Sequence, residues 1–213
     1  MMIWLKTQCF FFVDYLKTVW NYYRNRTFAK VDFLLRCRYF FQNPFRISRQ
    51  FLEKRGESDI YAYGETPLIT LDHICKECGM TKDDVVFELG CGRGITCFWL
   101  NLWLGCEVVG IEYIPKFVEN AQTVVQTHHL KGIRFRLEDM LETDLTGATI
   151  IYLYGTCLDD ESIQKLVEKF SQLPKGTKII TTSYSLPAFE ITHRFKGRFA
   201  WGQSAIYCHQ IGG

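Results

Sequence analysis

Hydrophobic and polar residues alternate in a regular way between residues 84 and 185. Short apolar runs, each followed by a turn, predict five β-strands at residues 85–89, 107–111, 133–137, 148–154 and 177–184. Apolar residues at helical spacing lie between them and predict helices at residues 95–104, 115–129 and 159–173. Strands that are apolar along their whole length and alternate with helices are typical of a parallel sheet covered on both faces. We therefore expect an α/β fold.

The end of the chain has a different pattern. Residues 190–196 alternate between polar and apolar side chains, and residues 204–210 are mostly apolar. Gly197 and Gly202 lie between these two runs, and no helical pattern separates them. This spacing predicts a pair of antiparallel strands that closes the sheet.

Residues 1–60 form an aromatic-rich segment in which we expect helices at residues 3–23 and 28–42. Pro44 ends the second helix, because the residue before a proline avoids helical geometry, and residues 46–59 continue as a helix or linker. We divide the chain into an N-terminal helical extension, residues 1–60, and a main domain, residues 61–213. The first helix is expected to turn one apolar stripe toward the core, the alternative being a helix that lies on a membrane surface. That stripe consists of Leu5, Cys9, Phe12, Leu16, Val19 and Tyr23.

The charge of the chain is unevenly distributed. The 213 residues carry a net charge of +2, but residues 1–60 hold eleven Lys or Arg and five Asp or Glu, which is +6. A basic segment of this kind can meet RNA, an anionic membrane surface or an acidic partner, or can simply be a solvated helix surface. The longest uncharged run near the start, residues 7–13, is too short to span a bilayer.

The cysteines and histidines indicate the compartment and the absence of a metal site. Nine cysteines, several of them inside apolar runs, indicate reduced thiols in a cytoplasmic protein. The basic segment leaves open that the protein also associates with the surface of a membrane. Cys75 and Cys78 form one C-x-x-C pair without a second pair at zinc-site spacing, and the five histidines show no metal-ligand spacing. We expect no metal.

A glycine-rich loop follows the first predicted strand. Its sequence, Glu-Leu-Gly-Cys-Gly-Arg-Gly over residues 88–94, lies where a parallel sheet binds ligands, at the carboxyl ends of its strands. A dinucleotide-binding loop would need glycine at position 95, where Ile95 stands. The spacing therefore favours a ligand whose polar end is an amino acid over a pyrophosphate.

Two acidic positions follow the next two strands. Glu112 comes at the end of the second predicted strand, at the separation from the glycine loop expected of a side chain that accepts hydrogen bonds from ribose hydroxyls. Asp139 and Met140 follow the third strand, where a carboxylate can bind the adenine amino group and a methionine can lie against the ring. The alternatives are a surface glutamate for Glu112 and ordinary core packing for Met140.

Taken together, these features resemble the class I S-adenosylmethionine-dependent methyltransferases over residues 84–185. The resemblance implies a Rossmann-like, seven-stranded, mostly parallel sheet, methyltransferase activity, S-adenosyl-L-methionine as cofactor and S-adenosyl-L-homocysteine as product. It also implies a set of residues that surround the cofactor. These are Thr66, Glu88, Gly90, Cys91, Gly92, Gly94, Glu112, Tyr113, Asp139, Met140 and Tyr154.

A narrower resemblance concerns the sequence Tyr-Ala-Tyr-Gly-Glu-Thr-Pro at residues 61–67. It is similar to a segment of the non-SET protein-lysine methyltransferases, in which this loop covers the cofactor and a hydroxyl at the position of Thr66 contacts the amino-acid part. The alternative is a plain turn in which Thr66 and Pro67 begin a helix at residues 68–79. The resemblance implies a protein substrate that is methylated on lysine.

The acceptor side is expected at the end of the fourth strand, where Tyr154 stands. The Asn/Asp-Pro-Pro-aromatic tetrapeptide of amino-methylating nucleic-acid enzymes is missing there, which argues against that class. We expect Tyr63, Tyr154, Tyr184 and Trp201 to wall an aromatic channel, and Glu65 to orient the amine or take its proton. Tyr63, Glu65 and Tyr154 are thus the catalytic candidates. A methyltransferase for RNA or a small molecule, and a non-catalytic cofactor-binding module, remain the alternative functions.

Overall fold

Seven strands form a single twisted sheet in the computed structural model, which describes the backbone of residues 2–57 and 59–212 and the side chains of residues 7–57 and 59–212. The strand order is β3-β2-β1-β4-β5-β7-β6, with β1 to β5 parallel and β7 antiparallel to both its neighbours. The predicted fold class is therefore confirmed, including the antiparallel closing pair. The strands are β1 (Val85–Leu89), β2 (Glu107–Glu112), β3 (Ile133–Leu137), β4 (Ile150–Leu153), β5 (Lys178–Thr182), β6 (Glu190–Phe199) and β7 (Gly202–Gln210).

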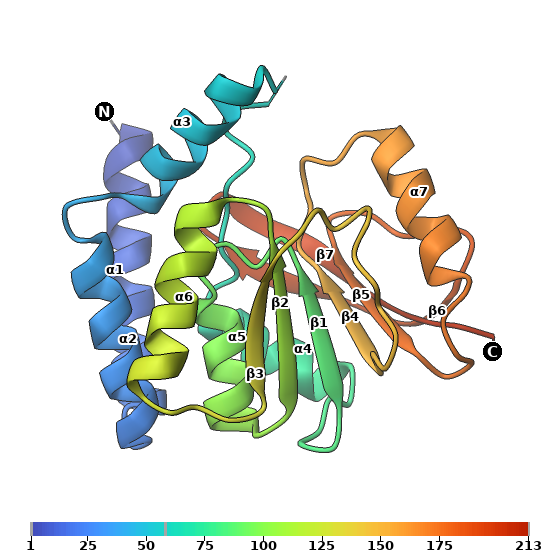
Figure 1. The fold of residues 1–213 in the computed structure, drawn as a ribbon, viewed down its shortest axis with the longest axis horizontal. Coiled ribbons are helices and arrows are strands. Elements are labelled where there is room, and N and C mark those ends of the chain that lie inside the picture. The colour runs from blue at the N-terminus through green and yellow to red at the C-terminus, as the bar shows by residue number, and fades with distance from the viewer. Residues whose placement is uncertain (1, 58, 213) are drawn as a thin grey trace.

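The two faces of the sheet are covered unequally. On one face, α4 (Leu68–Glu77), α5 (Ile95–Trp99) and α6 (Pro115–Thr127) pack over one large hydrophobic cluster. On the other face, α7 (Asp160–Phe170) packs over a smaller cluster. The predicted helix at 95–104 forms, but its second half is a π-helical turn, η1 (Leu100–Leu104). Figure 1 shows α7 on the right of the sheet and α6 on the left.

Three further helices make up the N-terminal extension: α1 (Met2–Tyr22), α2 (Arg26–Tyr39) and α3 (Pro44–Arg55). The side chains of Asn25 and Asn43 each accept a backbone hydrogen bond at the start of the next helix, so α2 and α3 begin where capping residues occur. In Figure 1, α1 and α2 stand as an outer layer beside α6, and α3 lies above α6 at the upper left. The segment predicted as a helix or linker is thus a helix.

The extension shares its core with the main domain. α2 packs against α5 and α6, and Phe28, Val31 and Leu35 are fully buried in the same hydrophobic cluster as Trp99 and Phe117. Each side chain of this kind contributes about 1.5–3 kcal/mol through burial. The division at residue 60 therefore separates two parts of the sequence, but one hydrophobic core includes residues from both parts.

The expected orientation of α1 is wrong for part of its stripe. Cys9, Phe12 and Leu16, expected to face the core, are exposed, whereas Thr18 and Tyr22 are buried. Both faces of this helix are apolar, so periodicity alone could not say which one packs against α4. None of the helices in the described part of the chain has the length and apolar character needed to cross a bilayer.

Candidate functional site

The loop after β1 has a backbone that requires glycine. Gly90, Gly92 and Gly94 have φ values of 74°, 54° and 78°, in the left-handed region that side chains disfavour. A Cβ on Gly92 would lie 2.9 Å from the ring of Tyr63, and one on Gly94 would lie 2.5 Å from the ring of Phe135. The loop therefore combines a sharp turn with close packing, as a cradle for a ligand needs.

Glu112 ties this loop to the end of β2. One carboxylate oxygen accepts hydrogen bonds from the backbone N–H of Tyr113 and Ile114, both at 2.9 Å, and the other accepts the N–H of Gly92 at 2.8 Å. Burial raises the pKa of Glu112, and the three backbone N–H groups oppose that rise. Because the second oxygen accepts only one of these bonds, it keeps the capacity to accept another hydrogen bond, as a ribose ligand requires.

Glu88 points into the fold. Thr96 donates its hydroxyl to one carboxylate oxygen at 2.5 Å, and the thiol of Cys97 donates to the other at 3.0 Å. Burial raises the pKa of Glu88 to about 7, against the hydrogen bonds that favour its ionised form. In this structure, Glu88 holds the first turn of α5 against β1, and so positions the glycine loop between them.

The expected adenine end lies between the loop after β3 and helix α3. Asp139 is exposed and its carboxylate caps the N–H of Leu141 at 2.9 Å. The terminal methyl of Met140 comes within 3.3 Å of the Cβ position of Gly90, so it packs on the glycine loop. Tyr113 packs edge-on against Phe51 of α3, at 5.3 Å between ring centroids. The N-terminal extension therefore covers this end of the site.

The segment at residues 63–67 is held by a partly buried ion pair that the sequence did not reveal. Arg93, which lies between Gly92 and Gly94 of the glycine loop, donates two hydrogen bonds to the carboxylate of Glu65, at 2.6 and 2.9 Å, and the hydroxyl of Tyr63 donates a third. Although burial opposes ionisation, the charge of Arg93 holds the pKa of Glu65 below its usual range. A carboxylate held ionised in this way is a poor proton acceptor, so the geometry opposes the proton-taking role expected of Glu65.

On its other side, the same segment contacts β4. The hydroxyls of Thr66 and Tyr152 are hydrogen-bonded, so Thr66 does not act as a helix cap, and Pro67 occupies that position in α4 without a side-chain bond. The ring of Tyr154 lies 2.7 Å from the Cβ position of Gly64. Residues 63–67 therefore bridge the glycine loop and β4 at the carboxyl edge of the sheet.

The predicted aromatic channel forms only in part. The indole N–H of Trp201 donates to the hydroxyl of Tyr154 at 3.0 Å, which joins the tip of the β6–β7 hairpin to the end of β4. Tyr63 packs over Gly92, and Tyr184 packs in the hydrophobic cluster on the opposite face of the sheet. The expectation that Tyr184 walls the channel is thus wrong, because the turn after β5 directs it toward the α7 face.

A cavity of about 590 Å³ opens between α1 and this hairpin tip. Its walls are mostly apolar, and among its described wall residues only Asp14 carries a carboxylate. Burial raises the pKa of Asp14 to about 6, while Arg36 and Lys17 act in the opposite direction. Lys17 and Arg198 line the cavity as well. Asp14 was not predicted, although it is the only acidic residue in the first helix. The apolar wall residues include Phe10, Val13, Pro67, Ile69, Phe199 and Trp201.

No group of three or more metal-ligating side chains is arranged to hold an ion in the described part of the chain. The residues that are present suit S-adenosylmethionine instead. The glycine cradle, the free acceptor capacity of Glu112 and the exposed carboxylate of Asp139 lie at one edge of the sheet. These are the groups that a ligand with a ribose, an adenine and an amino-acid end requires.

Comparison with known proteins decides the family. A family model described as a methyltransferase domain matches residues 80–210, more than half of the chain. The chain belongs to this methyltransferase family. Its fold and family are those of the class I S-adenosylmethionine-dependent methyltransferases, so it is an enzyme with S-adenosylmethionine as its cofactor.

Three relatives illustrate the range of substrates. The chain is 26% identical over 192 residues to a histone H3 lysine-79 methyltransferase of Dictyostelium discoideum, covering 80% of this chain but 10% of that protein. It is 22% identical over 161 residues to human EEF1A lysine methyltransferase 2, covering 70% of this chain and 68% of the other. A crystal structure of an RNA methyltransferase from Salinibacter ruber with S-adenosyl-L-homocysteine superposes with a TM-score of 0.60 at 25% identity, covering 69% and 93% of the two chains.

Proposed function

We propose that this methyltransferase transfers a methyl group to a lysine side chain of a protein. The observation that carries the proposal is the placement of residues 63–67, the segment that resembles lysine methyltransferases, between the glycine loop and Tyr154. Two relatives described as lysine methyltransferases support the same substrate class.

The chain's own residues would hold the cofactor in a fixed orientation. We propose that the glycine loop approaches its amino-acid end, together with Thr66, that Glu112 accepts a hydrogen bond from the ribose, and that Asp139 and Met140 bind the adenine. S-adenosylmethionine, when bound, supplies a methyl group that is already activated on a sulfonium. The protein then has mainly to align the acceptor, and positioning of this kind can contribute about 7–11 kcal/mol to catalysis.

The acceptor side suits a long side chain with a basic end. Tyr154 and Trp201 form an aromatic wall beside the apolar cavity, and an apolar surrounding lowers the pKa of a lysine so that it loses its proton more readily. Asp14 lies in the wall of that cavity without a hydrogen bond or ion pair of its own in the described structure. We propose that Asp14 attracts the basic substrate side chain and that Tyr154 positions the amine.

The test is methyl transfer from labelled S-adenosylmethionine into a cell extract, followed by nuclease or protease treatment and acid hydrolysis. We expect label that survives nuclease and appears as methylated lysine. A Gly92→Val variant is the matched blank, since its Cβ would meet Tyr63 at a position whose φ already disfavours a side chain. Label in other amino acids, or only in small molecules, would reject the proposal.

RNA is the second candidate acceptor. The structural likeness to an RNA methyltransferase and the net charge of +6 on residues 1–60 favour it. In that case nuclease treatment would release the label, and RNA binding would weaken steeply with added salt.

A further inference from the structure

Most of the large hydrophobic side chains that are exposed in the described structure lie on the N-terminal extension. Of thirteen such residues, nine lie between positions 11 and 45. Trp20 and Phe41 are 85% and 89% exposed, which is unusual for side chains of this size. A contiguous apolar surface on a folded protein marks a place where something else binds. The residues that stand out most are Phe12, Leu16 and Trp20 on α1 and Phe33, Phe40 and Phe41 at α2, and we call them the outer aromatic face.

The spacing along each helix turns these side chains away from the core. Phe12, Leu16 and Trp20 recur every four residues and therefore form one stripe on α1, opposite the buried Thr18 and Tyr22. α2 has the same division, with Phe33 exposed and Phe28 fully buried. Since α1 and α2 are the outer layer over the helices of the sheet, both stripes face away from the fold (Figure 1).

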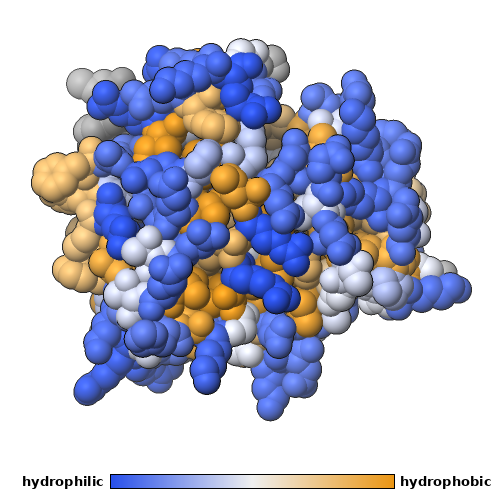
Figure 2. All heavy atoms as spheres, in the orientation of Figure 1, coloured by the Kyte–Doolittle hydropathy of each residue, from blue (hydrophilic) through white to orange (hydrophobic). Residues whose placement is uncertain are grey.

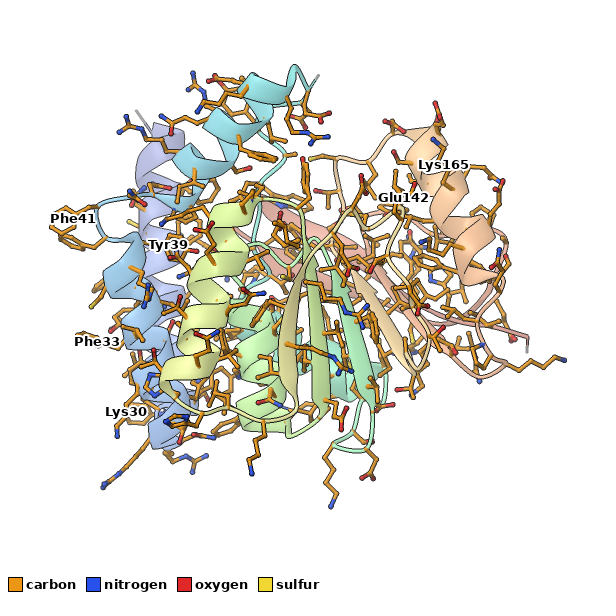
Figure 3. All side chains as sticks on the ribbon, viewed as in Figure 1. Lys30, Phe33, Tyr39, Phe41, Glu142 and Lys165 are labelled. Carbon is orange, nitrogen blue, oxygen red and sulfur yellow. The ribbon has the colours of Figure 1, made fainter. Side chains whose placement is uncertain are left out.

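The figures show two residues of this face, Phe33 and Phe41, at one margin of the molecule. Phe33 of α2 and Phe41 of the segment that follows α2 point outward at the left of Figure 3, with Lys30 below them. In the same orientation, Figure 2 shows hydrophobic residues that project at the left margin, next to hydrophilic ones. The exposed aromatic side chains thus lie beside basic residues.

The charges around the outer aromatic face are of one sign. Arg24, Arg26 and Lys30 are exposed and form no ion pair in the described structure. The acidic residues of α1 and α2 do not balance them: Asp14 is half-buried, and the fully buried Asp32 is paired with Arg36 at 2.9 Å. Neither acid is exposed. An anionic surface would therefore meet aromatic side chains and cations together.

We propose that the outer aromatic face docks this enzyme on the surface of an anionic lipid bilayer. Aromatic and leucine side chains that enter the boundary between headgroups and acyl chains, with Lys and Arg beside them, are the pattern of a helix that lies in the membrane surface. A second copy of the chain fits less well, because two extensions of charge +6 would repel one another. The docked enzyme would act on substrates held at the membrane.

The catalytic edge would stay free in the docked state. The glycine loop and the β6–β7 hairpin tip belong to the sheet and its loops, and none of their residues is part of the outer aromatic face. Docking therefore needs no rearrangement of the site. The docking proposal therefore does not depend on which molecule accepts the methyl group.

Flotation of the purified protein with vesicles tests this proposal. We expect the protein to float with vesicles of phosphatidylcholine that contain phosphatidylserine as the minor, anionic lipid, weakly with phosphatidylcholine alone, and less at high salt. Trp20→Ser or Phe41→Ser should reduce the partition coefficient by about tenfold or more, as the loss of a buried aromatic surface requires. Methyl transfer to a soluble substrate should be unchanged, because these side chains are almost entirely exposed.

Ile191→Ser is the matched control, since Ile191 is an exposed hydrophobic residue of β6 (45%) outside the outer aromatic face. It should float as the unchanged protein does. No flotation with anionic vesicles, or equal flotation of the Trp20→Ser and Phe41→Ser variants, would overturn the proposal. A dimer in sedimentation equilibrium that Trp20→Ser abolishes would also overturn it, because the face would then be an interface between two copies.

Discussion

The ion pair between Arg93 and Glu65 gives the sharpest test of how the site is assembled. Arg93 belongs to the glycine loop and Glu65 to the segment that bridges it to β4, and their side chains are 13% and 21% exposed. Replacing Arg93 by Met would leave the partly buried Glu65 carboxylate with Tyr63 as its one remaining hydrogen-bond donor in the described structure. Breaking a buried pair in this way costs about 3–5 kcal/mol. Because both side chains remain partly exposed, we expect a loss at the lower end of this range, about 3 kcal/mol in the free energy of unfolding.

The assay is urea denaturation of the unchanged protein and of the Arg93→Met variant, with calorimetric titration of S-adenosylmethionine. For a chain of this length, a loss of about 3 kcal/mol corresponds to a fall in Tm of roughly 6–12 °C. Cofactor affinity should fall as well, since Tyr63 packs on Gly92 and is held by Glu65. Arg49→Met is the matched control, because the Arg49–Glu53 pair is exposed and should contribute almost nothing.

The pair also predicts a dependence on pH. Because the folded-state pKa of Glu65 lies below its unfolded value of 4.5, its contribution to stability is present above pH 4.5 and is lost as the pH falls through the lowered pKa. Glu65→Gln removes this contribution. The variant and the unchanged protein should therefore become similar in free energy of unfolding as the pH falls below the lowered pKa of Glu65. Equal losses from Arg93→Met and Arg49→Met at neutral pH would refute the reasoning.

Three further predictions concern single carboxylates. Glu112→Gln should weaken S-adenosylmethionine binding by about 1–3 kcal/mol, as calorimetry would measure, and unchanged affinity would remove Glu112 from the cofactor site. Glu88 has a folded pKa near 7, raised by burial, so its stabilising effect is complete below pH 4.5 and is lost as the pH rises through 7. Above pH 7, the free energy of unfolding of Glu88→Gln should therefore rise by up to about 3 kcal/mol relative to that of the unchanged protein. Denaturation curves in which the two proteins differ by the same amount at every pH would contradict this. Asp14→Asn should raise the KM for a protein acceptor several-fold without changing cofactor affinity. Asp83→Asn, a matched change at an exposed position before β1, should leave the KM unchanged, and equal KM values for both variants would exclude Asp14 from substrate binding.

The sequence by itself determined most of the main domain. All seven strands and the helices between them were predictable, because an apolar period of about 3.6 residues or a continuous apolar run is a local property of the chain. The glycine loop was equally visible, since its backbone at Gly90, Gly92 and Gly94 requires residues without a side chain. The acidic positions at the ends of β2 and β3 followed from the order of the strands.

The tertiary structure alone decided which residues meet. Arg93 and Glu65 are 28 positions apart and Thr66 and Tyr152 are 86 apart, so nothing in the local pattern pairs them. The same holds for Asp14, which periodicity treats as an interruption of a helix and packing places in the wall of a cavity. α1 has two apolar faces, and only its contact with α4 determines which one is left to solvent. Periodicity describes the surface of one element, whereas pairing depends on the orientation of two elements, which the packing of the whole core determines.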